Sequence, residues 1–268
     1  MILIKGAGDL ASGVAVRLAH CGFKIVMTDL PHPTSIRRTV CFSEAIPNGA
    51  AVVEDVTAEF AASAEDVSAI HTRGHIAVLA DAAADCRNRL HPDVIVDAIL
   101  AKKNLGTSMN DAPVVITLGP GFTAGVDCHA VIETMRGHDL GRVILSGSAQ
   151  PNTGIPGNIS GFTTERVLRA PKAGIFAEVR HIGDIVERGD TVAEVDGEPV
   201  TASIGGIIRG LLPTGTPVFA GMKSGDIDPR PVKEHCYSVS DKARAIGGGV
   251  LEAILMLLKE AAYVSESR

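Results

Sequence analysis

The stretch that decides the fold is MILIKGAGDLASGVAVRLAHCG, residues 1–22. Four apolar residues lead to a turn at Gly6, and residues 10–21 then show helical spacing until Gly22. A strand, a glycine turn and a helix in this order begin a βαβ unit, whose helix N-terminus can bind dinucleotide phosphates. The stretch therefore predicts an α/β fold with a parallel sheet.

The composition indicates a globular protein with an aliphatic core. The 268 residues are 46% hydrophobic and only 3% aromatic, and the net charge is -6. This charge gives no basic surface for a nucleic-acid backbone, so we expect no nucleic-acid partner. The five cysteines are scattered and form no C-x-x-C pair, which favours reduced thiols in the cytoplasm.

Apolar runs are too short to cross a membrane. The first run stops at Lys5, so we expect no signal peptide. No later run approaches the ~18 uncharged apolar residues of a membrane span. We expect a cytoplasmic protein that does not enter the membrane, and a homo-oligomer is left open.

Apolar runs alternate with helical patterns in the first half of the chain, which predicts parallel strands joined by crossover helices. We predict a Rossmann-like, mostly parallel sheet in a domain of residues 1–165. Residues 126–145 fit strand and helix equally well. The expected strands are residues 2–5, 24–29, 51–54, 75–80, 94–97 and 113–118, and the expected helices are 10–21, 56–70 and 81–90.

Short β runs between Gly and Asp turns replace this pattern after Pro171. Two similar halves predict a small barrel or sandwich over residues 166–235, which resembles the barrel-sandwich hybrid fold of biotinyl and lipoyl carriers. The hairpin at residues 195–200, VDGEPV, lacks the lysine that would carry biotin or lipoate. In residues 236–268 we expect a helix, capped by Ser240, that packs back on the α/β domain.

The first candidate site is the glycine turn. Gly6, Gly8 and Ala11 match the spacing G-x-G-x-x-G/A, and Asp29 ends the next predicted strand at 29 minus 6, or 23, positions. An acid at this distance can accept hydrogen bonds from ribose hydroxyls. Asp9 is the irregularity, because a carboxylate beside a pyrophosphate is unfavourable unless it binds a hydroxyl, a metal or the helix N-terminus.

Two interpretations remain open for this turn. It can bind a nucleotide of the NAD(P) or FAD type, or it can belong to a scaffold that retains the fold without a ligand. An NAD(P)-dependent oxidoreductase is a further alternative. The chain offers no Tyr-x-x-x-Lys motif for proton transfer near a nicotinamide, which counts against hydride transfer.

A second glycine loop, TLGPGFTAG, covers residues 117–125. If its strand is parallel to the first, Gly119 and Gly121 lie at the same sheet edge, where open α/β sheets bind ligands. A tight turn without a ligand explains these glycines equally well. Arg37 and Arg38 follow the strand that ends at Asp29 and could bind a phosphate, although such a pair is more often solvated or caps a neighbouring helix.

Four further residues could contact an anion or another ligand. Asn152 and Asn158 lie in a surface loop, where asparagine is also a good turn former. Lys242 and Arg244 precede three consecutive glycines, 247–249. A glycine in a helix costs about 1 kcal/mol relative to alanine, so this run indicates either close helix packing or an anion.

No metal site is predicted. His71 and His75 stand four apart and His129 follows Cys128, but a third ligand is missing and a structural role is favoured. Asp226 and Asp228 could face a cation, although a turn with Arg230 as ion-pair partner is the better interpretation. Among the cysteines, Cys128 is the best candidate for a reactive thiol, but a buried, inert core cysteine is the favoured interpretation.

Several sequence blocks in order identify a family resemblance: GAGDLASGVAVRL, IRRTV, LGPGFTAGVDCHAVIETMRGHDLG, NTGIPG, KSGDIDPR and SDKARAIGGGVLEA. Together they resemble the YqeB-type selenium-dependent molybdenum hydroxylase system proteins over nearly the whole chain. The N-terminal region is also similar in style to XdhC-type maturation factors, which have a Rossmann-like domain and handle molybdenum cofactor. The resemblance implies an accessory protein for maturation of molybdenum hydroxylases, with such a hydroxylase or its maturation machinery as partner. It also adds a molybdopterin-type cofactor to the ligands expected at the glycine turn. It supplies no catalytic residue.

Overall fold

The computed structural model describes residues 1–266, with side-chain surroundings up to residue 258. It contains two compact units. The large unit combines residues 1–33, 42–153 and the chain from Val239 onward, and the small unit combines residues 34–41 and 154–238. The division at 153–154 lies earlier than the expected boundary at 165–166, and the small unit also includes a segment of the first half of the sequence.

The large unit is built on a nine-stranded sheet with the order β3-β4-β5-β2-β1-β6-β7-β8-β9. The strands from β4 to β8 are parallel neighbours, and β3 and β9 pair antiparallel at the two edges. The strands are β1 (Ile2–Lys5), β2 (Ile25–Asp29), β3 (Ala50–Val53), β4 (Val56–Ala61), β5 (Ile76–Ala80), β6 (Val94–Asp97), β7 (Val114–Leu118), β8 (Ala130–Ile132) and β9 (Val143–Ile144).

Strand β1 lies in the middle of this sheet. The chain first adds β2 and later β5 on one side of β1, and then adds β6, β7 and β8 on the other. The direction of winding thus reverses between β1 and β6. In open α/β sheets, ligands bind at such a reversal, beyond the carboxyl ends of the strands.

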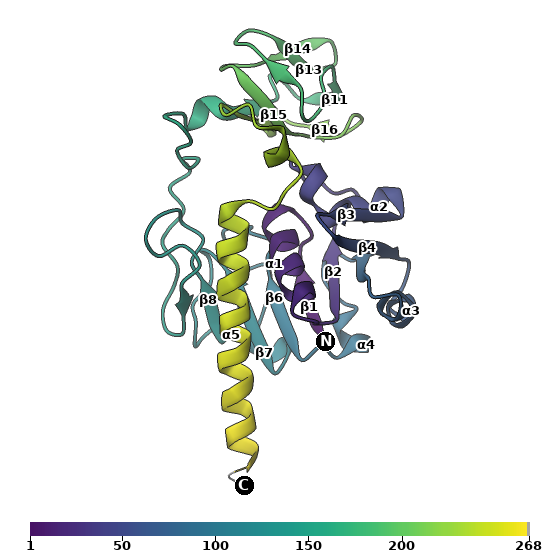
Figure 1. Cartoon of the computed structure of the whole chain (residues 1–268), viewed down its shortest axis with the longest axis vertical. Coiled ribbons are helices and arrows are strands. Elements are labelled where there is room, and N and C mark those ends of the chain that lie inside the picture. The colour runs from purple at the N-terminus through teal and green to yellow at the C-terminus, as the bar shows by residue number, and fades with distance from the viewer. Residues whose placement is uncertain (267–268) are drawn as a thin grey trace. The chain divides into compact units, whose positions relative to one another are not determined.

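Helices α1 (Asp9–His20) and α5 (Asp241–Glu266) pack against each other, and α5 also contacts β7, β8 and β9 (Figure 1). Their contact needs glycine, because a Cβ on Gly13 would lie 2.5 Å from the Cβ of Ala243. Ser240 Oγ accepts a hydrogen bond from the Ala243 N–H at 3.2 Å. The predicted N-cap of the last helix is therefore confirmed.

An apolar cluster fills the other face of the sheet. It joins Leu3, Ile95 and Val115 of the strands to Val67 and Ile70 of α3 (Val67–Thr72). Strands that are buried on both faces have few polar positions, which is why the apolar runs of the first half correctly predicted most of them. The remaining short helices are α2 (Ala45–Asn48) and α4 (Arg87–Leu90).

Two helix predictions were wrong. Residues 56–70 contain the strand β4 and then α3, because Glu54 and Asp55 form a tight turn that returns the chain along β3. Of residues 81–90, only α4 is an α-helix. Residues 126–145, which fitted both patterns, contain β8 and β9.

The small unit contains two four-stranded antiparallel sheets, with the orders β10-β17-β15-β12 and β14-β13-β11-β16. The predicted hairpin at 195–200 is confirmed, and Asp196 and Gly197 both have left-handed backbone at its turn. The strands are β10 (Val167–Arg169), β11 (Gly174–Glu178), β12 (Ile185–Val186), β13 (Thr191–Val195), β14 (Glu198–Thr201), β15 (Gly206–Leu211), β16 (Pro217–Val218) and β17 (Lys223–Asp228).

Among the described residues, no helix combines the length and the apolar character that a membrane crossing requires.

Candidate functional site

The first glycine turn lies at the carboxyl end of β1. Gly6 has φ +97°, and a Cβ there would lie 3.0 Å from the Ala98 carbonyl oxygen, so only glycine fits without strain. Gly8 caps α1 with an extended backbone, and Asp9 is the first helical residue. Ser12 Oγ donates to the Ala7 carbonyl at 3.0 Å. The N-terminus of α1 therefore starts directly above the end of β1.

Asp29 is bound to this turn by the backbone. Its Oδ2 accepts from the Ala7 N–H at 2.8 Å and its Oδ1 from the Leu30 N–H at 2.7 Å. Burial raises the pKa of the Asp29 carboxyl, and these two N–H groups act in the opposite direction. Each carboxylate oxygen keeps further acceptor capacity. Asp29 thus fixes the turn and can still accept a hydrogen bond from a ligand.

The second glycine loop lies at the same sheet edge, because β7 is parallel to β6 and β6 to β1. Gly119 and Gly121 both have left-handed backbone, with φ +71° and +108°. A Cβ on Gly119 would lie 2.5 Å from Thr134 Oγ1, and one on Gly121 would lie 2.6 Å from the Lys103 nitrogen. Close packing within the chain therefore explains both glycines without a ligand.

A buried polar group joins the ends of β1 and β6. Lys5 Nζ donates to Thr107 Oγ1 at 2.6 Å, and Thr107 Oγ1 donates to Asp97 Oδ2 at 2.5 Å. The Lys5 ammonium is also 3.7 Å from Asp97 Oδ2, and both side chains are less than a tenth exposed. No sequence motif marks Lys5 and Asp97, although each is the charged last residue of an apolar strand.

Lys242 lies at the N-terminus of α5, close to the charges of Asp9 and Glu133. Burial lowers the pKa of Lys242 and so does the positive charge of Arg136, whereas the carboxylates of Asp9, Glu133 and Asp241 raise it. Its ammonium makes no hydrogen bond to the part of the chain that the structure describes. Lys242 is therefore a partly buried cation whose ammonium N–H donors are available to a ligand.

The neighbours of Lys242 are held rigidly. Arg136 makes two hydrogen bonds to the Asp241 carboxylate, at 2.6 and 2.9 Å. Glu133, which is 3% exposed, accepts from the Met135 N–H at 2.7 Å and from the Gln150 N–H at 2.8 Å. Glu133 directly follows β8, and its position after a short apolar run was the only signal for it in the sequence.

The arginine pair of the sequence prediction belongs to the small unit. Arg37 donates to the carbonyls of His235 and Ser238, at 3.0 and 3.2 Å. Arg38 donates to the Leu211 carbonyl at 2.9 Å and forms an ion pair with Glu178. Their guanidinium groups thus bind other parts of the small unit, and neither arginine is among the residues that the large unit brings together.

Two of the other predicted contact residues, Arg244 and Asn158, have roles within the chain. Arg244 pairs with Glu54 at 2.5 Å, and Asn158 Oδ1 accepts from the Gly161 N–H at 3.0 Å, as a turn former does. Asn152 is exposed. In the glycine run, a Cβ on Gly249 would lie 2.0 Å from the Gly141 carbonyl oxygen. Close packing therefore explains this glycine.

The side chains that were considered as metal ligands contact other residues of the chain. His71 Nε2 is 2.8 Å from the Ile25 carbonyl oxygen, and His75 pairs with Glu59. In β17, Asp226 pairs with Arg166 at 3.1 Å and Asp228 with Arg230 at 2.7 Å. Among the described residues, no three His, Cys, Asp or Glu side chains are grouped for a metal ion.

The thiol of Cys128 is fully buried and lies 3.3 Å from Thr117 Oγ1. Burial raises the pKa of this thiol, which makes it a poor nucleophile. The prediction of a buried core cysteine is confirmed. His129 Nδ1 accepts from the Val115 N–H at 3.0 Å, which is a structural role.

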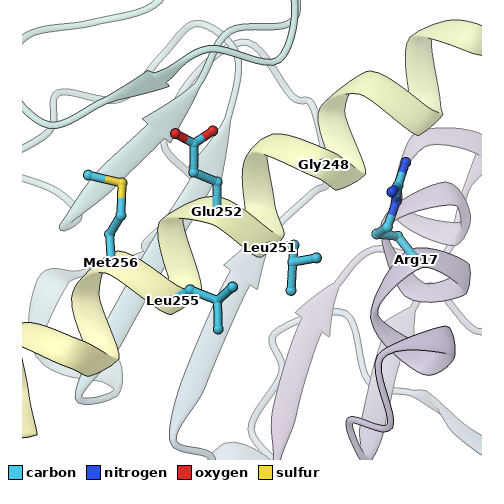
Figure 2. Close-up of a pocket in the computed structure, with 6 residues that line it drawn as sticks. All are labelled: Arg17, Gly248, Leu251, Glu252, Leu255 and Met256. Carbon is cyan, nitrogen blue, oxygen red and sulfur yellow. The ribbon is translucent and has the colours of Figure 1, made fainter.

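Two surface pockets lie away from this edge. The first pocket lies between α1 and α5 and is drawn in Figure 2. None of the predicted site residues lines it. The other, of about 670 Å³, lies where β6, β7 and β8 begin, at the opposite edge of the sheet, and its lining includes His91 and His129. The first pocket is lined by Arg17, Gly248, Leu251, Glu252, Leu255 and Met256.

Comparison with known proteins gives one close curated relative. The chain is 54% identical over 260 residues to the uncharacterized protein YqeB of Escherichia coli (strain K12). These residues are 97% of the chain but 48% of the relative, so the chain spans about half of its length. The similarity supports the YqeB-type resemblance of the sequence blocks over that half. No family model matches the chain.

Solved structures give distant similarities only. The aspartoacylase family protein of Mesorhizobium loti is 13% identical, with coverage of 54% of this chain and 60% of that one and a TM-score of 0.24. The succinylglutamate desuccinylase/aspartoacylase of Rhodobacter sphaeroides is 14% identical, with coverages of 84% and 86% and a TM-score of 0.24. The product-bound ectoine utilization protein EutE (DoeB) of Ruegeria pomeroyi is 19% identical, with coverages of 31% and 27% and a TM-score of 0.22.

Proposed function

We propose that the protein is a cytoplasmic accessory factor for maturation of selenium-dependent molybdenum hydroxylases. In this role, a Rossmann-like large unit binds a nucleotide or a molybdopterin-type cofactor. The barrel-sandwich-hybrid-like small unit docks the hydroxylase or its maturation machinery. The sequence blocks support the biological role, and the carboxyl edge of the large sheet supports the ligand.

One observation carries the ligand proposal. Beside the winding reversal at β1, the edge combines the turn of Gly6 and Gly8, the N-terminus of α1 and the ammonium of Lys242. Phosphates bind at helix N-termini because the unpaired N–H groups and the helix dipole favour an anion. Lys242 adds a positive charge whose donors are not taken up by the described chain.

The carboxylates of Asp9 and Asp29 define the rest of the ligand. The two carboxylates weaken the binding of a diphosphate alone without abolishing it, whereas a ligand with hydroxyl or amino groups can also donate to them. Ribose hydroxyls and the amino groups of a pterin both provide such donors. The charges at this edge therefore favour a phosphorylated ligand with a polar, hydrogen-bond-donating remainder.

Binding experiments test the ligand. NADH, NADPH, FAD and molybdopterin cytosine dinucleotide are titrated into the protein by calorimetry, and we expect one of them to bind. Lys242→Met should weaken that binding about tenfold or more, because a charge-assisted hydrogen bond contributes roughly 1.5–3 kcal/mol. The control Lys24→Met removes an exposed lysine at the amino end of β2 and should leave binding unchanged. Absence of binding by all four compounds would contradict the ligand proposal.

A reconstitution assay tests the biological role. Apo-hydroxylase is incubated with cofactor, selenide and the protein, and its recovered activity is measured. The wild type should increase the recovery, and Lys242→Met should increase it less. Equal recovery with and without the protein would contradict a role in maturation.

A further inference from the structure

Residues 98–107, AILAKKNLGT, form the first part of the connection from β6 to β7, and we name them the clamp loop. The clamp loop touches both glycine turns through its backbone. A Cβ added to Gly6 would lie 3.0 Å from the Ala98 carbonyl oxygen. A Cβ added to Gly121 would lie 2.6 Å from the Lys103 backbone nitrogen. The loop therefore extends along the sheet edge from the first glycine turn to the second.

Side-chain hydrogen bonds fix the clamp loop at its end. Thr107 Oγ1 donates to Asp97 Oδ2 at 2.5 Å and accepts from Lys5 Nζ at 2.6 Å. Asn104 Oδ1 accepts from the N–H groups of Gly106 and Thr107, both at 2.8 Å. The buried lysine of β1 thus holds the loop at the point where the winding of the sheet reverses.

The middle of the clamp loop has an unfavourable backbone. Leu100 and Lys102 have φ +60° and +62°, a region that residues with a Cβ rarely adopt. Such conformations persist only where the surrounding contacts impose them, and they cluster at ligand clamps and active sites. Here the contacts at the two glycine turns and the hydrogen bonds of Thr107 impose them.

The unfavourable segment presents two lysines. Lys102 and Lys103 are adjacent and exposed, and neither side chain makes a hydrogen bond or ion pair within the described chain. Lysine is a common phosphate ligand because its ammonium offers three donors and a concentrated charge. The loop thus places two unpaired positive charges next to the glycine turns of the candidate site.

We infer that Lys102 and Lys103 bind the phosphate or diphosphate group of the ligand in this site. The inference rests on the function proposed above and names the residues that neutralise the ligand's charge. The shared chemistry is a diphosphate, which occurs both in nicotinamide or flavin dinucleotides and in a pterin dinucleotide. The carboxylates of Asp9 and Asp29 then face the uncharged, hydrogen-bond-donating part of the ligand.

The test uses Lys102→Met and Lys103→Met in the full chain, with Lys24→Met as the matched control. Each variant removes one exposed lysine charge and keeps most of the side chain. Inorganic pyrophosphate and the four compounds named above are titrated by calorimetry at low salt. We expect each clamp-loop variant to bind pyrophosphate and the selected compound about tenfold more weakly than the wild type. Lys24→Met should bind both as the wild type does.

The outcomes separate the two proposals. If the wild type and both clamp-loop variants bind a nucleotide or pterin compound equally well, the inference is wrong and the proposed ligand class stands. If the wild type binds such a compound but not pyrophosphate, the diphosphate contact is wrong. If the wild type binds none of the compounds, both proposals are overturned. Thermal unfolding of each variant, expected to match the wild type, checks that the fold is intact.

Discussion

Gly121 and Gly125 lie in one loop and both have left-handed backbone, with φ +108° and +86°. Their surroundings differ. A Cβ on Gly121 would lie 2.6 Å from the Lys103 nitrogen, whereas one on Gly125 would meet nothing within 4 Å. The left-handed backbone favours glycine at both positions, but only Gly121 also contacts the clamp loop.

Replacement of each glycine by alanine separates the cost of backbone strain from the cost of steric overlap with the clamp loop. Gly121→Ala should lower the free energy of unfolding by about 2–4 kcal/mol, because the added Cβ strains φ and displaces the clamp loop. Gly125→Ala should lower it by only about 1–2 kcal/mol, from the strained φ alone. Urea denaturation measures both values. Equal losses would show that the clamp loop moves away without cost.

Asp228 is the centre of the buried charges of the small unit. Its carboxylate is fully buried and accepts from Arg230 Nη2 at 2.7 Å, from Arg230 Nε at 2.9 Å and from Arg209 Nη1 at 3.3 Å. Burial acts to raise the pKa of Asp228, but the hydrogen bonds from Arg230 and the two positive charges lower it below its ordinary value.

Asp228→Asn should lower the free energy of unfolding of the small unit by about 3–5 kcal/mol, because Arg209 loses its buried counter-charge. Glu187→Gln, at an exposed position of the same unit, should stay within about 0.5 kcal/mol of the wild type. Hydrogen exchange of the amides of β15 and β17 reports the change. A small effect of Asp228→Asn would mean that the arginines find other acceptors.

The lowered pKa also predicts a pH dependence. The stability that Asp228 contributes is fully present above the unfolded-state pKa of about 4 and is lost as the pH falls through the folded-state value. The wild type should therefore lose stability on acidification, and Asp228→Asn should lose less of it. Parallel curves for the two proteins below pH 4 would contradict this assignment.

At the scale of elements, the glycine run of α5 contains one tightly packed glycine and one glycine with open space around it. A Cβ on Gly249 would lie 2.0 Å from the Gly141 carbonyl oxygen, which makes this glycine necessary for packing. Gly248 lies beside it, in the pocket wall drawn in Figure 2, and a Cβ there would meet nothing within 4 Å. The two adjacent glycines are matched in helix position and differ only in contact.

Gly248→Ala should raise the free energy of unfolding by about 0.5–1 kcal/mol, because alanine loses less backbone entropy in a helix. Gly249→Ala should lower it by about 2–4 kcal/mol, because α5 must move away from residue 141. Thermal and urea unfolding of the two variants give the values. A gain at Gly249 would show that the overlap is relieved by a small shift of the helix.

Much of the large unit was predictable because its strands are apolar on both faces and end at glycine or polar residues. Residues 56–70 were misassigned because VTAEFA has no clear period, and its pairing with β3 and β5 decides the structure. The glycine turn of Gly6 was predictable from local spacing. Lys5, Asp97, Glu133 and the clamp loop were not, because they come together only through strand order.

At the scale of the whole molecule, the small unit is assembled from two segments that are far apart in the sequence. Residues 34–41 belong to it together with residues 154–238. The Leu211 N–H donates to the Ile36 carbonyl at 2.9 Å, and a Cβ on Gly210 would overlap Ile36. Local patterns cannot reveal such a contact. This explains why the sequence suggested a continuous domain and did not show that Arg37 and Arg38 belong to the small unit.

Arg38 tests this assembly. Its Nε donates to the Leu211 carbonyl at 2.9 Å and its guanidinium pairs with the partly buried Glu178. Arg38→Ala should lower the stability of the small unit by about 1–3 kcal/mol, because it removes a charged hydrogen bond and leaves Glu178 without this partner. Amides of β11 and β15 should then exchange faster, while those of β1 and β6 exchange at the wild-type rate. The exposed Arg180→Ala serves as control and should change neither unit. Faster exchange in β1 and β6 alone would assign residues 34–41 to the large unit instead.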